Sequence, residues 1–142
     1  MFSFFKKKNN KTESNSHLIL KTAALLIHAA KIDENYSNIE KKIIKEAILI
    51  LHPEINDIEK LISDAENQEK NSNQILDFTK EIKNADKTFK IKIVETLWKI
   101  IYSNEEADMY ETNLMRRLSG LLYLDNKLVG EIKENVKKNL LK

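Results

Sequence analysis

Apolar residues recur along this chain with the 3.6-residue spacing of α-helices, and the pattern predicts about seven helices. The first, from 17 to 31, is apolar on nearly every side, which is typical of a helix in the middle of a bundle. Pro53 ends a second helix, about 38–51, whose inward residues are expected to be Ile39, Ile43, Ile44, Ala47, Ile50 and Leu51. Further helices are expected at about 54–70, after Ser72 or Asn73, after Asp86, and at about 109–122 and 126–141.

Composition supports an all-α fold. The 142 residues suit one domain, and two glycines and one proline are too few for the turns of a β-sandwich. We therefore expect a single bundle of about seven helices over 17–142, preceded by a flexible amino-terminal arm at 1–16. Aromatic and basic side chains within 1–8 offer weak peripheral membrane contact as the alternative role of that arm.

Charge and cysteine content exclude several functions. Basic and acidic residues number 24 and 22, so no strong positive field exists to bind nucleic acid. The absence of cysteine excludes a disulfide scaffold and fits a reducing compartment. No apolar stretch is long enough for a transmembrane segment, so we expect a cytoplasmic protein with protein partners.

The two halves of the chain resemble each other at an offset of 71 residues. Apolar positions of the second helix then align with apolar positions of the sixth, and Lys45 aligns with Arg116. The polar loop before each helix also aligns, with Glu34 on Glu105 and Glu40 on Glu111. This agreement predicts an internal duplication, with two pseudo-symmetric halves.

The aligned loops carry oxygen-bearing side chains at relative positions 1, 3, 5 and 8. Hard divalent cations such as calcium or magnesium take ligands of this kind, whereas zinc is disfavoured because no thiolate or nearby histidine is present. The candidate metal ligands are Asp33, Asn35, Ser37 and Glu40 in the first segment, and Asn104, Glu106, Asp108 and Glu111 in the second.

The same residues also fit a purely structural role. Ser37 and Glu40 have the spacing of a capping box, and Asp108 and Glu111 form its acidic version. Helix starts attract acidic residues without any ligand, through the helix dipole. An acidic patch that contacts a protein is a third interpretation, and the sequence leaves all three open.

The repeated order of apolar helix, acidic loop and helix beginning with S/D-x-x-E resembles the TerB (tellurite-resistance protein B) family. The best-resembling stretches are 97–111 and 114–122, and Asp77-Phe78-Thr79 resembles a short motif between the halves. The resemblance implies a helical bundle with an acidic, divalent-metal-binding surface and a role in stress-response or membrane-associated complexes. Asn104 replaces an expected aspartate, and Glu34 and Glu105 replace expected glycines, which weakens the metal expectation.

We therefore expect a non-enzymatic, TerB-like interaction module that binds a divalent cation at the acidic loops and is linked to tellurite or stress response. A metal-dependent hydrolase that uses the same acids is one alternative. A structural adaptor without metal is another.

Overall fold

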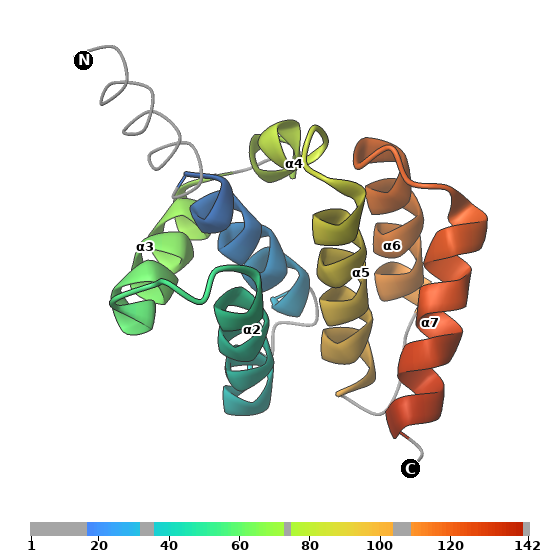
Figure 1. The fold of residues 1–142 in the computed structure, drawn as a ribbon, viewed down its shortest axis with the longest axis horizontal. Coiled ribbons are helices and arrows are strands. Elements are labelled where there is room, and N and C mark those ends of the chain that lie inside the picture. The colour runs from blue at the N-terminus through green and yellow to red at the C-terminus, as the bar shows by residue number, and fades with distance from the viewer. Residues whose placement is uncertain (1–16, 32–35, 73–74, 104–108, 141–142) are drawn as a thin grey trace.

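The computed structural model describes residues 17–31, 36–72, 75–103 and 109–140, all of it helices and short connections (Figure 1). The first helix covers residues 17–30. The others are α2 (Asn38–Leu51), α3 (Ile58–Asn71), α4 (Leu76–Ile82), α5 (Lys87–Tyr102), α6 (Met109–Leu121) and α7 (Asn126–Leu140). No strand occurs in these ranges, so the predicted all-α bundle is confirmed.

The core is built around α5 and the first helix. α5 packs against α7 and also against α2, which joins the two ends of the bundle shown in Figure 1. In the first helix every residue from 22 to 27 is buried, as expected for a helix that is apolar on nearly every side. The largest fully buried side chains include Leu26 there, Ile48 on α2 and Leu97 on α5.

The predicted inward face of α2 is partly wrong. Ile44 and Ala47 are buried as expected, but Ile39 and Ile50 are 63% and 61% exposed. They lie eleven residues apart, close to three helical turns, so both project from the same outer stripe of α2. The bundle covers only one side of α2, and the apolar surface of α2 is wider than the covered side.

Local chemistry sets where the neighbouring helices begin. A turn follows Pro53, and α3 begins at Ile58, because the Asp57 side chain accepts a hydrogen bond from the Lys60 amide at 3.1 Å. The predicted cap of α4 by Ser72 is wrong, since Ser72 ends α3 and Ile75 precedes α4. Asn73, the other predicted cap, lies outside the described residues.

Helix bounds follow the offset of 71 residues seen in the sequence. The first helix corresponds to α5, and α2 corresponds to α6. The aligned pairs Ile44 with Met115 and Ala47 with Leu118 are all buried. This correspondence supports the predicted duplication.

None of the helices in the described ranges is long and apolar enough to cross a membrane. The predicted arm at 1–16 and its membrane contact lie outside the described residues, and both stay predictions.

Candidate functional site

The start of α2 is fixed by a complete capping box between Ser37 and Glu40. The Ser37 hydroxyl oxygen accepts from the Glu40 amide at 3.2 Å, and the Glu40 Oε1 accepts from the Ser37 amide at 2.9 Å. These two bonds satisfy amides that the helix itself leaves unpaired. The structural interpretation of this pair is therefore confirmed for the first acidic segment.

Glu40 is also unusual in its burial, because only 1% of the residue is exposed. A charged carboxylate at this depth is stable only when hydrogen bonds replace its lost hydration. The Ser37 amide supplies one of them. Glu40 is therefore a structural part of the start of α2.

Tyr36, immediately before the capping box, faces a group of acids. Burial, together with the negative charges of Glu66, Glu40 and Glu69, raises the pKa of Tyr36 well above its usual value. Its buried hydroxyl has no hydrogen-bond partner within the described chain. Tyr36 therefore lies near the second half of α3, where Glu66 and Glu69 are located.

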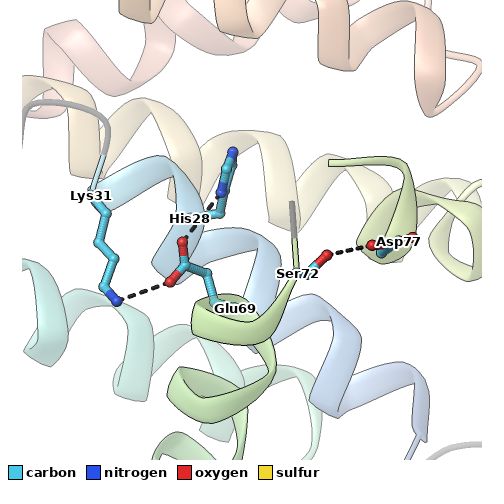
Figure 2. Close-up of polar contacts among 5 residues, drawn as sticks. All are labelled: His28, Lys31, Glu69, Ser72 and Asp77. Carbon is cyan, nitrogen blue, oxygen red and sulfur yellow. Dashed lines mark hydrogen bonds and ion pairs between the residues drawn. The ribbon is translucent and has the colours of Figure 1, made fainter. Parts of the chain in front are cut away.

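Basic side chains offset the charge of the α3 acids. Glu69 lies 2.9 Å from the Lys31 Nζ and 3.4 Å from the His28 Nδ1, so it bridges two residues at the end of the first helix (Figure 2). Glu66 lies 3.5 Å from the Lys41 Nζ on α2. These contacts tie the first helix, α2 and α3 together around Tyr36.

Glu66 and Glu69 were not among the residues predicted from the sequence. They are three residues apart on α3, so they share a helix face, but that spacing is common on exposed helices. Only tertiary packing brings them close to Tyr36. No sequence signal identifies them beyond this acidic pair.

The eight predicted metal ligands are described only in part. Asp33, Asn35, Asn104, Glu106 and Asp108 lie outside the described residues. Glu111 falls in α6, where the structure describes the backbone but not this side chain. Within the described part of the chain, no three histidine or acidic side chains are grouped so that they could hold a metal ion.

A separate surface cavity of about 510 Å³ lies between the first helix, α3 and α4. His17 and Glu81 are at its edge, with His17 Nε2 2.7 Å from Glu81 Oε1, and Phe78 contributes apolar surface. Ser72 and Asp77, which hydrogen-bond to each other in Figure 2, also line it. None of the predicted site residues lines this cavity.

Comparison with known proteins agrees with the architecture. The family model described as tellurite resistance protein TerB matches residues 19–134, which is most of the chain. No curated protein and no solved structure matches. The helical bundle, with its capped acidic segment between paired helices, is thus a TerB domain. The chain belongs to the TerB family.

Proposed function

We propose that this chain is a non-enzymatic interaction module that binds a protein partner through the outer face of α2. The observation that carries the proposal is the exposure of Ile39 and Ile50, at 63% and 61%, on one stripe of a helix whose opposite side packs into the core. Leu49, 40% exposed, extends this apolar surface at the end of α2. About 16 Å of helix separates Ile39 from Ile50. Exposed Lys42 and Glu46 lie between them, so the face combines apolar ends with a charged middle, a mixture that is common at protein-binding surfaces.

The surroundings of the α2 face also suit partner binding. The capping box and the ion pairs of Glu66 and Glu69 hold the start of α2 against α3 and the first helix. A face held in this way loses little conformational freedom on binding, which favours affinity. Asn38 and Lys42, which are exposed in the first half of α2, would supply polar contacts at the rim.

A divalent cation is not part of this mechanism. The Ser37 and Glu40 oxygens already take part in the capping box, and Glu40 is buried. These two residues therefore do not fit a preformed calcium or magnesium site. The predicted cation sites stay a prediction that rests on the other six residues.

The same geometry argues against the hydrolase alternative. A catalytic acid must reach substrate or a metal-bound water. Glu40 is 1% exposed and accepts from a backbone amide, so its position suits a structural role.

The family description names tellurite resistance, and we extend the proposal to a cytoplasmic role of the module in that response.

The test compares the double variant Ile39→Ser/Ile50→Ser with the control Leu76→Ser, which changes an apolar residue of α4 that is 47% exposed. Both proteins should keep the stability of the original, because exposed substitutions change it by about 0.5 kcal/mol or less. Each is used as bait in tellurite-treated bacteria, and bound proteins are quantified by mass spectrometry.

We expect a partner that the original chain and the α4 control retain and the double variant loses. Equal capture by all three proteins would contradict a role for the α2 face. Loss of tellurite tolerance in the double variant, with the α4 control unaffected, would support the proposed process. Unchanged tolerance in the double variant would contradict a role in tellurite resistance. The α2 interaction face would then be tested by the capture experiment alone.

A further inference from the structure

The exposed residues of α2 form a stripe with the spacing of a coiled-coil contact. Its members are Ile39, Lys42, Glu46 and Leu49, and exposed Ile50 lies beside the last of them. Successive members are three, four and three residues apart, as are the contact positions of a two-stranded coiled coil. Apolar residues occupy both ends of the stripe, and opposite charges occupy its middle. A helix that packs on α2 must complement this order.

The stripe is complementary to its own reverse. Ile39 and Leu49 are equally distant in the sequence from Ile44, at the centre of the stripe. Lys42 and Glu46 are also equally distant from this centre. A second α2 that runs antiparallel, with a twofold axis at the level of Ile44, therefore brings apolar residues against apolar residues and opposite charges against each other. A parallel pair would instead bring Lys42 against Lys42, and these like charges repel.

The two charges of the stripe are not used within the described chain. The neighbouring lysines of α2, Lys41 and Lys45, form ion pairs with acids of α3. Within the residues that the structure describes, Lys42 and Glu46 form no ion pair, either with α3 or with each other. They are four residues apart, but a lysine on the amino-terminal side is the less favourable orientation for such a pair. Both charges are therefore free to contact a second molecule.

We propose that the α2 face binds a second copy of this chain through an antiparallel pair of α2 helices. This inference rests on the proposed function, because it names the partner of the same face. Lys42 pairs with Glu46 of the second copy, and Ile39 packs against Leu49 of the second copy. The twofold axis repeats both contacts, and Ile50 widens the apolar contact at each end.

The length of α2 limits the strength of this association. The helix has 14 residues, so a pair of them buries less area than the interface of an ordinary stable dimer. Salt screens exposed charges, so high ionic strength weakens the Lys–Glu contacts further. The association is therefore weak and dependent on salt.

Sedimentation equilibrium of the purified full chain tests the proposal. The protein concentration covers roughly 5–500 μM at low salt, because small interfaces bind weakly. The variants are Lys42→Glu, Glu46→Lys and the double variant that combines them. The matched control is Lys127→Glu, which makes the same change of charge as Lys42→Glu at an exposed residue of α7. Circular dichroism shows whether each variant is folded.

We expect the original chain and Lys127→Glu to dimerise equally. Each single α2 variant should weaken dimerisation about tenfold or more, because it brings like charges together at both symmetric positions. The double variant should recover dimerisation, since it exchanges the two charges and keeps them opposite. An equimolar mixture of Lys42→Glu and Glu46→Lys should also associate, because every charge in that mixed pair faces its opposite.

A chain that stays monomeric at every concentration would overturn the inference. So would a dimer that the single variants leave unchanged, or two single variants that do not associate when mixed. These failures differ from failure of the proposed function. A monomeric chain that captures another protein, and loses it in Ile39→Ser/Ile50→Ser, would support the proposed function and overturn only the choice of partner. A monomeric chain with equal capture by that double variant would contradict both.

Discussion

The hydroxyl of Tyr36 is buried beside three carboxylates and has no hydrogen-bond partner within the described chain. Leaving such a group unpaired costs about 1–3 kcal/mol, whereas replacing it with hydrogen removes that cost. Tyr36→Phe should therefore raise the free energy of unfolding by about 1 kcal/mol in urea denaturation at neutral pH.

The control for this substitution is Tyr123→Phe, since Tyr123 is 68% exposed and its hydroxyl is solvated. It should change the free energy of unfolding by less than about 0.5 kcal/mol. A loss of stability in Tyr36→Phe as large as the expected gain would mean that the Tyr36 hydroxyl has a partner.

The raised pKa of Tyr36 also predicts how stability depends on alkaline pH. Burial and the charges of Glu66, Glu40 and Glu69 keep this phenol protonated in the folded chain at pH values where an unfolded tyrosine ionises, near 10. The unfolded state then binds fewer protons, so stability is complete below about pH 10 and falls above it. Urea denaturation from pH 8 to 11 should show a smaller loss in Tyr36→Phe than in the original chain. Parallel curves would contradict the buried, acid-flanked position of Tyr36.

Glu40 allows the capping and metal interpretations to be separated. Its Oε1 accepts from the Ser37 amide, and glutamine can keep that bond. We expect Glu40→Gln to leave any calcium- or magnesium-induced rise in Tm unchanged, as measured by thermal melts with each ion and with EDTA. If the original chain showed an ion-induced rise in Tm and Glu40→Gln did not, Glu40 would be a metal ligand. No rise in the original chain at any ion concentration would contradict the predicted cation sites.

At this scale, the sequence predicts what depends on neighbouring residues and misses what depends on packing. Ser37 and Glu40 are three residues apart, so their capping box follows from spacing alone. Glu66 and Glu69 reach Tyr36 only because α3 packs beside α2. No local rule connects residues so far apart in the chain.

Among the helices, α6 ends in a turn in which Tyr123 has a φ of 58°, and the Lys83 and Lys90 ammonium groups lie over its ring. This backbone conformation is costly for a residue with a Cβ. A left-handed conformation costs a residue with a Cβ about 1–2 kcal/mol, while an exposed cation–π contact returns about 0.5–1 kcal/mol. Comparing Tyr123→Gly with Tyr123→Ala isolates the backbone cost, because both variants remove the ring. The glycine variant should be the more stable by about 1 kcal/mol in urea denaturation. Equal stability would show that the positive φ at Tyr123 is not strained.

Helix α2 shows why an apolar pattern predicts a helix better than it predicts the buried face. Ile39, Ile43, Ile44, Ile48 and Ile50 span about half of its circumference, so the 3.6-residue period is clear. The period does not indicate which part of so wide a surface the bundle covers. The pattern therefore predicts that Ile39 and Ile50 lie in the core, whereas the structure shows them exposed.

Across the whole molecule, α5 makes the two halves depend on each other. It packs against α2 of the first half and α7 of the second, and its buried residues belong to the same core cluster as those of the first helix. A duplicated sequence suggests two units, but the shared core contradicts the idea that each half is stable without the other. The fold class can be predicted from composition and the helical period. The dependence of the two halves on each other becomes visible only in the packing of α5.

The shared core predicts a single unfolding transition. Trp98, the sole tryptophan, lies on α5 and donates to the Val129 carbonyl of α7 at 3.2 Å, so its fluorescence reports the second half. Ile62→Ala on α3, where Ile62 is 1% exposed, should cost about 2–4 kcal/mol. It should shift the transitions by fluorescence and by far-ultraviolet circular dichroism equally, because folding is cooperative. The exposed substitution Leu76→Ser serves as control and should shift neither. If Ile62→Ala shifted circular dichroism while leaving fluorescence of Trp98 unchanged, the halves would unfold separately, and the interaction face on α2 would then depend on the first half alone.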